Sequence, residues 1–110
     1  MNKHNFLDTI RQAGRKRIIY TSHALDEMNA EDEIISLKEV KEIVLYGEII
    51  EDYPDDKRGH SCLMSGFTKR NRPVHVVCSP REDFLWMITV YIPSDGKWEE
   101  NFKIRKRRDK

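Results

Sequence analysis

The sequence predicts an α+β fold in which N-terminal helices pack on one face of a four-stranded antiparallel sheet. Two observations support this prediction. Apolar residues follow a helical period as far as Gly47, and beyond it they alternate with a period of two. Turn-rich segments also divide the second half into short stretches, and short connections favour an antiparallel meander. Helices followed by strands are typical of the α+β class.

Three helices are expected, each with residues that favour a helix end. With their caps they cover about residues 5–14, 21–28 and 36–47. The first is expected to end at Gly14, because glycine is common just after the last helical residue. The clearest start is at Ser36, which can form a capping box with Glu39, each side chain bonding the other residue's backbone N–H.

Four strands are expected after Gly47, and residues 17–20 form a further brief extended piece. The strands cover residues 49–53, 61–67, 73–78 and 84–92. A turn centred near Glu82 places His75 opposite Thr89. On this register His75, Thr89 and Tyr91 project from the open face of the sheet. The other face packs on the helices and contains Val74, Val76, Trp86 and Ile88.

The whole chain, residues 1–110, is expected to form a single domain, because this length accommodates one hydrophobic core. Its longest apolar stretch, residues 84–92, is far shorter than the roughly 20 residues of a membrane-spanning helix. The N-terminus has no apolar signal segment. We therefore expect a cytoplasmic protein without membrane association, whose two cysteines are reduced and buried. Its oligomeric state is left open.

Charge is unevenly distributed, although the net charge is only +1. Residues 21–56 contain two Lys against twelve Asp and Glu, whereas residues 97–110 contain seven Lys and Arg against three Asp and Glu. This asymmetry suggests a polyanion-binding surface opposed to an acidic back. Chance clustering on a solvated surface is the alternative. The last segment, residues 98–110, is expected to be helical to about Arg105, with a basic tail at about 102–110.

The residue types favour RNA cleavage without a metal ion. Attack by the ribose 2′-hydroxyl needs a base, an acid, and cations or hydrogen-bond donors at the phosphate. His23 and His75 are the candidate proton-transfer residues, and the helix N-terminus beside His23 would keep it neutral. Thr89 and Tyr91 complete the candidate catalytic set, because they can donate to phosphate or orient the His75 ring. The candidate RNA-binding residues are Arg81, Lys103, Arg105, Arg107 and Arg108.

Each of these residues also has an ordinary structural role as its alternative. Single histidines are more often structural than catalytic, and a basic run is most often a solvated tail. Only the combination favours a function. A zinc site would need His60, Cys62, His75 and Cys78. We exclude it because residues 75 and 78 point to opposite faces of one strand. No metal and no cofactor is therefore expected.

Several ordered sequence blocks resemble a bacterial and archaeal family of small domains. These blocks span about residues 18–107 and read SHALDEM, IISLKEVKEIVLYGEIIEDYPDD, SCLMSGF, RPVHVVCS and ITVYIPSDGKWEENFKIRKR. The family is grouped with the RelE, BrnT and MqsR toxins, and its members are often encoded beside a small zinc-finger antitoxin. The resemblance implies a RelE/barnase-like toxin fold and endoribonuclease activity. It also implies two partners, RNA and a cognate antitoxin of the zinc-finger type.

The resemblance assigns the family's site positions to this chain, with one departure. The matching positions are His23, His75, Thr89, Tyr91, Pro93, Trp98, Lys103 and Arg105. Many relatives have arginine where this chain has Glu27. The chain then uses another phosphate-binding residue, belongs to a branch with different chemistry, or is inactive. Two further function classes stay open, a non-catalytic nucleic-acid-binding module and an interaction-only remnant of the toxin fold.

Overall fold

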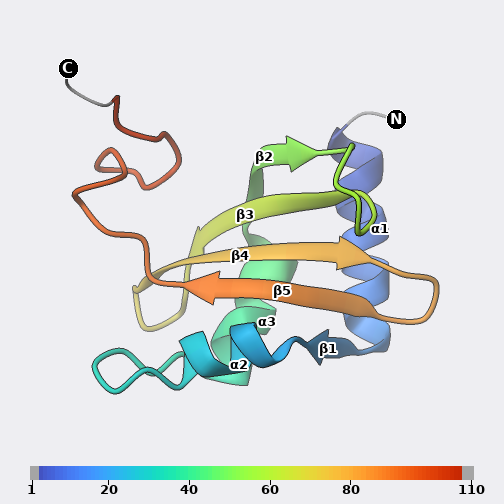
Figure 1. The fold of residues 1–110 in the computed structure, drawn as a ribbon, viewed down its shortest axis with the longest axis horizontal. Helices are drawn as coiled ribbons and strands as arrows, with labels where there is room; N and C mark the ends of the chain where they lie inside the picture. The colour runs from blue at the N-terminus through green and yellow to red at the C-terminus, as the bar shows by residue number, and fades with distance from the viewer. Residues whose placement is uncertain (1–2, 108–110) are drawn as a thin grey trace.

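Helices pack against a five-stranded mixed sheet (Figure 1). The computed structural model describes residues 3–107. In chain order the elements are α1 (Lys3–Lys16), β1 (Ile18–Tyr20), α2 (Ser22–Met28), α3 (Leu37–Tyr46), β2 (Glu48–Tyr53), β3 (Ser61–Phe67), β4 (Pro73–Pro80) and β5 (Leu85–Tyr91). The strand order across the sheet is β1-β5-β4-β3-β2. None of the helices within residues 3–107 has the length and apolar character needed to cross a membrane.

The expected α+β class is confirmed, but the sheet is larger than expected. Strands β2 to β5 occupy the four expected positions, and each pair of adjacent strands among them is antiparallel. The expectation of four antiparallel strands is wrong because the extended piece before α2 is a fifth strand, β1, parallel to β5. Leu85 N donates to the Arg17 carbonyl at 2.8 Å, and Thr21 N donates to the Met87 carbonyl at 3.0 Å. A three-residue strand whose partner lies so far along the chain has too short a pattern to reveal this pairing.

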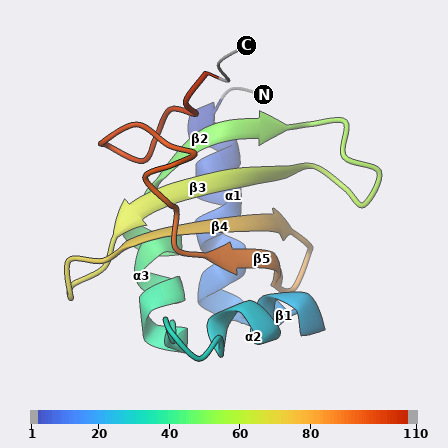
Figure 2. The ribbon, with the colours of Figure 1, turned by 60° about the vertical axis from the view of Figure 1, so that its left-hand side comes forward.

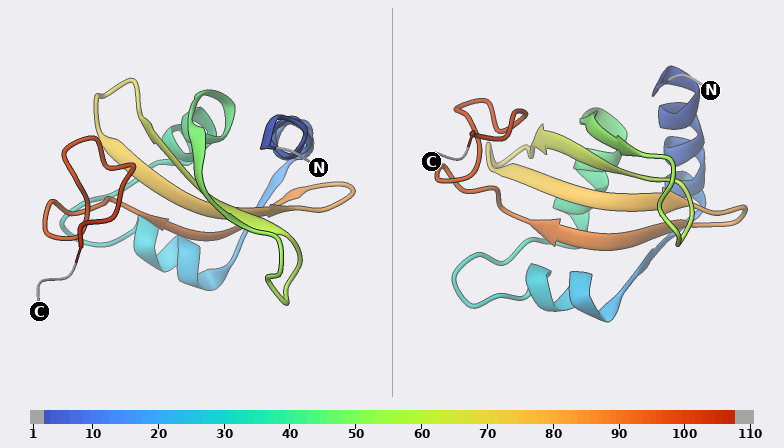
Figure 3. Two further views of the ribbon diagram at one scale, coloured as in Figure 1. Left: turned by 90° about the horizontal axis from the view of Figure 1, so that it is seen from above. Right: turned by 45° about the horizontal axis from the view of Figure 1, so that its top comes forward.

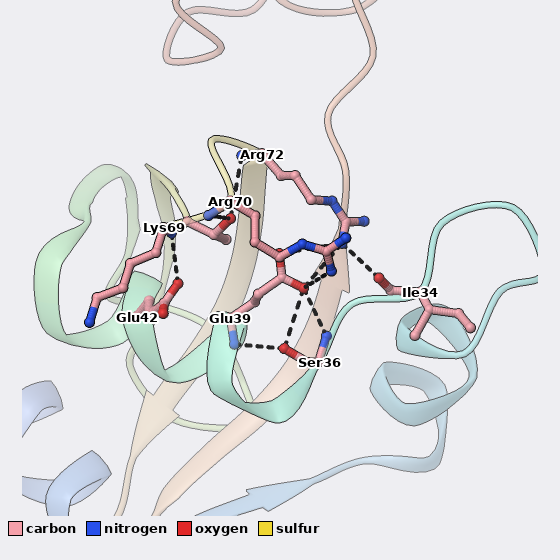
Figure 4. A network of polar contacts seen from close by, with 8 residues as sticks. Ile34, Ser36, Glu39, Glu42, Lys69, Arg70 and Arg72 are labelled. Atoms are coloured by element: carbon pink, nitrogen blue, oxygen red, sulfur yellow. Dashed lines mark hydrogen bonds and ion pairs between the residues drawn. The ribbon is translucent and has the colours of Figure 1, made fainter.

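The helix ends follow the sequence at α3 but not at α1. The capping box is confirmed, since Ser36 N donates to Glu39 Oε1 and Glu39 N donates to Ser36 Oγ, both at 3.1 Å (Figure 4). Helix α1 continues past Gly14, where it was expected to end. A Cβ on Gly14 would lie 3.0 Å from Val44 Cγ1 and 3.4 Å from Leu85 Cδ2. Glycine at this position therefore allows α1 to pack closely on α3 and β5.

The helices divide between one face and one edge of the sheet. Figure 3 shows α1 and α3 on one face, with the β2–β3 loop and the C-terminal segment projecting to the other side. Between these helices and the sheet lies a core that includes Ile10, Val40, Ile43, Val44, Met64, Val74, Val76, Leu85 and Met87. Helix α2 follows β1 along the β5 edge, where the Thr21 hydroxyl donates to the Ile88 carbonyl at 2.8 Å. We call the face away from α1 and α3 the outer face.

A β-bulge in β5 changes the expected register. His75 pairs with Tyr91 and Val77 pairs with Thr89, but the register then shifts so that Cys78 pairs with Met87. His75, Thr89 and Tyr91 do share the outer face, as expected, although His75 is not opposite Thr89. In the part of β5 before the bulge, each side chain therefore lies on the face opposite to the one expected. Trp86, expected in the core, is therefore on the outer face opposite Ser79.

The C-terminal segment, residues 94–107, is not helical to Arg105 as the sequence suggested. It forms an irregular hairpin in which Trp98 pairs with Arg105 in an isolated bridge. Glu99 N donates to the Ile104 carbonyl at 2.8 Å. Phe102 has a φ of 57°, a left-handed conformation that is incompatible with a continuing helix. Figure 2 shows this segment turning from the end of β5 back towards β2.

Candidate functional site

The two sequence-predicted residues His75 and Tyr91 form a hydrogen-bonded pair on the outer face. They lie opposite each other on β4 and β5, with 3.0 Å between His75 Nδ1 and the Tyr91 hydroxyl. Their rings meet edge to face, with centroids 5.2 Å apart. The strand alternation therefore brings a titratable ring and a phenol together, as two candidate catalytic residues should be.

His75 lies on the expected face, but that face is not open above it. The C-terminal segment covers the ring, so His75 is fully buried. The Trp98 ring meets the imidazole edge to face, with centroids 4.4 Å apart. The carbonyl of Phe102 lies 2.6 Å from His75 Nε2. Both ring nitrogens are therefore occupied, one by Tyr91 and the other by backbone.

These partners fix the tautomer of the neutral imidazole. A carbonyl only accepts, so Nε2 carries the hydrogen that binds Phe102, and Nδ1 accepts the Tyr91 O–H. Burial lowers the pKa of His75, while the Phe102 carbonyl and the Glu51 carboxylate raise it less. Burial likewise raises the pKa of Tyr91. Both shifts favour the neutral imidazole and the neutral phenol.

A second polar group, on the edge strand β2, holds the C-terminal segment beside the pair. Arg105 makes a bidentate contact with Glu51, with Nε at 2.7 Å and a terminal nitrogen at 3.1 Å. The Tyr53 hydroxyl donates to the same carboxylate. Arg105 is the main cause of the lowered pKa of Glu51. Burial and then Glu51 raise the pKa of Tyr53 to about 12.

Cations at this end of the outer face come from the C-terminal segment. Lys103 Nζ lies 2.9 Å from Glu48 Oε2. The Arg105 guanidinium lies 4.7 Å from the Trp98 ring centroid as well as against Glu51. Arg107 is exposed, and Arg108 lies outside the described residues. Lys103 and Arg105, predicted to bind RNA, are thus placed near His75 but are already paired with carboxylates.

His23 is exposed and forms a separate group with Glu27. His23 Nε2 lies 3.3 Å from Glu27 Oε1, and 67% of the histidine side chain is exposed. The same carboxylate oxygen accepts from Val90 N at 2.9 Å. Glu27 thereby satisfies a backbone N–H of β5 beyond the end of β1. The helix N-terminus beside His23 is visible in the sequence, whereas the contact with the Glu27 carboxylate was not predicted.

Arg81 lies at the opposite end of the outer face from His75. It donates to Ser79 Oγ at 3.2 Å and to the Arg58 carbonyl. Its guanidinium also lies 4.9 Å from the Trp86 ring centroid. His75 and Ser79 are four residues apart on β4, a separation of about 13 Å along a strand. The structure therefore does not bring Arg81 to the His75–Tyr91 pair. Thr89 lies between the two ends, opposite Val77.

The residues considered and rejected as zinc ligands fall on different faces of the sheet. Cys62 and Cys78 face each other within the core, and both are free and buried. His75 points the other way, to the outer face. His60 is stacked on Phe6 and lies 2.6 Å from an Asp52 oxygen. Among the described residues no three His, Cys, Asp or Glu side chains gather into a metal-binding group.

The residues that surround the His75–Tyr91 pair were not predicted from the sequence. Glu51, Tyr53 and the Phe102 carbonyl form no recognisable motif, because they come from an edge strand and an irregular segment. One usable signal was present. Glu51 and Tyr53 are two residues apart on a predicted strand, so their side chains are expected on the same face.

Taken together, the fold and site define an α+β domain with a His–Tyr pair on the outer face of a mixed sheet. The chain belongs to a family described as a domain of unknown function (DUF4258), whose family model matches residues 20–92. No curated protein and no solved structure matches the chain. The matched region includes His23, His75, Thr89 and Tyr91, and it ends before the C-terminal segment.

Proposed function

We propose that the protein is an endoribonuclease that cleaves RNA by attack of the ribose 2′-hydroxyl, without a metal ion. The observation that carries this proposal is the hydrogen bond between His75 Nδ1 and the Tyr91 hydroxyl, on a sheet face that also has Arg105 and Lys103. Proton transfer and charge stabilisation at phosphate are the two requirements of this reaction, and both residue types are present.

In the proposed reaction Tyr91 contacts the substrate and His75 acts behind it. The Tyr91 oxygen takes the proton of the 2′-hydroxyl while its own proton passes to His75 Nδ1. The 2′-oxygen bonds to phosphorus and the 5′-oxygen leaves, giving a 2′,3′-cyclic phosphate and a 5′-hydroxyl. The leaving oxygen takes a proton from His23, the second candidate proton-transfer residue, whose side chain is exposed.

The phosphate contacts are assigned to the cations of the C-terminal segment and to Thr89. Lys103 and Arg105 lie at the His75 end, while Arg81 is placed to contact a more distant phosphate of the same strand. Each phosphate contact adds about 0.7 to the log–log salt slope of single-strand binding. Neutralising Lys103, Arg105, Arg107 and Arg108 together should flatten that slope, and an unchanged slope would show that the segment is only solvated.

We further propose that the fold is of the RelE, BrnT and MqsR type and that a cognate antitoxin, of the zinc-finger kind, inhibits the protein in the cytoplasm. This proposed relationship is supported by the helices on one face of the sheet and the histidine–tyrosine pair on the other. Glu27 replaces the arginine of many relatives. Glu27 is an anion that accepts the Val90 N–H and does not bind phosphate. In this proposal Arg105 binds the phosphate in place of that arginine.

A second candidate function is RNA binding without cleavage. The complete burial of His75 and the engagement of both its nitrogens favour this alternative. In that case the outer face would hold RNA through its cations and half-exposed aromatic rings, such as Trp86, on which bases can stack. An interaction-only role would require neither cleavage nor RNA affinity.

Cleavage of single-stranded RNA in EDTA tests the proposal. We expect 2′,3′-cyclic phosphate ends, and a fall of about 10²- to 10⁴-fold in His75→Gln, which retains a donor for the Phe102 carbonyl. The matched control is His60→Gln, because His60 is remote from the pair and should change the rate little. Thermal melting verifies that each variant is folded. Cleavage that stops with EDTA, or that survives loss of both His75 and His23, would exclude this mechanism, and RNA binding without cleavage would favour the second candidate.

A further inference from the structure

The cations of the C-terminal segment are paired with carboxylates of one edge strand. Lys103 binds Glu48 at 2.9 Å, and Arg105 binds Glu51 at 2.7 and 3.1 Å. These are two of the residues that the sequence assigns to RNA phosphates. Glu48 and Glu51 are both on β2, so two oxygen anions of the protein occupy the positions that phosphate oxygens would take.

The same segment closes the site over His75. The Phe102 carbonyl accepts from His75 Nε2 at 2.6 Å, and Ser65 Oγ donates to that carbonyl at 3.4 Å. Trp98 is almost completely buried against the imidazole. Cation pairing and coverage of His75 therefore depend on one stretch of chain, and displacing this stretch would uncover the ring.

Part of the attachment of the segment consists of exposed ion pairs that a polyanion can replace. The segment has neither helix nor ladder within the described residues, only the isolated bridge between Trp98 and Arg105. The Lys103 and Arg105 side chains are each about half exposed. Exposed ion pairs of this kind contribute little individually and are screened by salt. A polyanion offers the same cations several phosphates at once and so competes effectively with two carboxylates.

We propose that residues 94–107 form a latch, closed by Glu48 and Glu51 and opened by single-stranded nucleic acid, which takes over Lys103 and Arg105 and uncovers His75. This inference rests on the proposed function, because it describes how the site of that function is regulated. Opening removes the Phe102 carbonyl from Nε2 and leaves the His75–Tyr91 hydrogen bond in place. Free protein then has a covered site, and RNA binding itself uncovers it.

Hydrogen exchange of the full chain tests the latch independently of cleavage. The His75 Nε2–H, which donates to the Phe102 carbonyl, reports displacement of the segment from the ring. The amides of Glu99 and Lys106, which bond within the segment, report loosening of its hairpin. The probe is an oligothymidylate about 20 nucleotides long, which has no 2′-hydroxyl and cannot be cut by the proposed reaction. We expect it to accelerate exchange of the His75 Nε2–H and of residues 94–107, and not of the backbone amides of the central strands β3 and β4.

A double variant provides the matched comparison. Glu48→Gln/Glu51→Gln removes both carboxylates and should speed exchange of the segment roughly fivefold without any nucleic acid, the combined effect of two exposed ion pairs. The control Glu31→Gln/Asp32→Asn removes two exposed charges of the α2–α3 connection and should leave exchange unchanged. The double variant should also cleave RNA faster than the wild type.

The outcomes separate the latch from the proposed function. Faster exchange in the double variant and with oligothymidylate, without cleavage by any variant, supports the latch and refutes the nuclease. A different result overturns the latch and leaves the proposed nuclease activity intact. In that case the wild type and the double variant cleave RNA at equal rates, and neither the double substitution nor oligothymidylate changes hydrogen exchange in residues 94–107.

Discussion

Replacing Arg72 by alanine should destabilise the fold strongly, because it removes the main cationic partner of a buried carboxylate. Arg72, which lies just before β4, contacts both the segment before α3 and helix α3 itself (Figure 4). One guanidinium nitrogen donates to the Ile34 carbonyl at 2.8 Å and lies 3.1 and 3.3 Å from the two Glu39 oxygens. Only 4% of the Glu39 side chain is exposed, against 22% of Arg72.

The expected cost follows from what Glu39 retains. Breaking a buried ion pair by removing one partner costs about 3–5 kcal/mol. Glu39 keeps its contacts with Ser36 from the capping box, and Arg72 is itself partly solvated, so we expect about 2–3 kcal/mol. In urea this lowers the unfolding midpoint by roughly 1–2 M at an unchanged slope.

Arg70→Ala is the matched control for this experiment. Arg70 carries the same charge and approaches the same carboxylate, but at 4.0 Å and with 71% of its side chain exposed. An exposed pair of this kind contributes about 0–1 kcal/mol. If Arg72→Ala costs no more than Arg70→Ala, burial does not control the strength of this network and the reasoning is refuted.

The pH dependence gives a second check on the same pair. Burial by itself raises the pKa of Glu39, but hydrogen bonds with Ser36 and Thr68 and the charges of Arg72 and Arg70 lower it overall. A carboxyl whose pKa is lower in the folded protein than in the unfolded chain stabilises the fold at pH values above its unfolded-state pKa. This stabilisation is lost as the pH falls through its folded-state pKa. The difference between wild type and Arg72→Ala should therefore shrink in acid, below the ordinary carboxyl pKa. A constant difference would contradict the assignment.

Three further predictions concern single contacts. Glu27→Ala should cost about 1–3 kcal/mol in urea unfolding, because Val90 N–H loses its acceptor, whereas Glu27→Gln keeps an oxygen and should cost less. Tyr53, whose pKa is raised to about 12, should ionise nearer its ordinary value of 10.0 in Glu51→Gln, as followed by ultraviolet titration. The two buried cysteines should react with a thiol reagent only as fast as the protein unfolds, and rapid labelling of the folded protein would contradict their burial.

Local patterns predicted most of the secondary structure because the relevant forces are local. The Ser36 capping box needs only four residues, and it formed as expected. The β3 strand was predicted with its observed bounds, residues 61–67, because turn residues bracket a short apolar run. By contrast Gly14 was taken for a helix end, and its real role is to let α1 pack against Val44 and Leu85, which only the tertiary structure reveals.

The geometry of the candidate site was predicted in part, for the same reason. Strand alternation placed His75 and Tyr91 on one face, and this needs no knowledge of distant residues. The bulge near Ile88 could not be inferred, and it moved Trp86 to the outer face. The cover over His75 depends on a left-handed Phe102 and on pairing with β2, a strand far along the chain. Contacts of that range leave no periodic trace in a single sequence.

The rate of RNA cleavage by Tyr91→Phe, measured in EDTA beside the wild type, tests the central claim most directly. The substitution keeps the ring that packs on His75 and removes only the hydroxyl that bonds its Nδ1. If this pair carries the proton transfer, cleavage should fall by about 10²- to 10⁴-fold while RNA affinity and thermal stability change little. If Tyr91→Phe cleaves RNA as fast as the wild type does, the reaction occurs elsewhere and the proposal is contradicted.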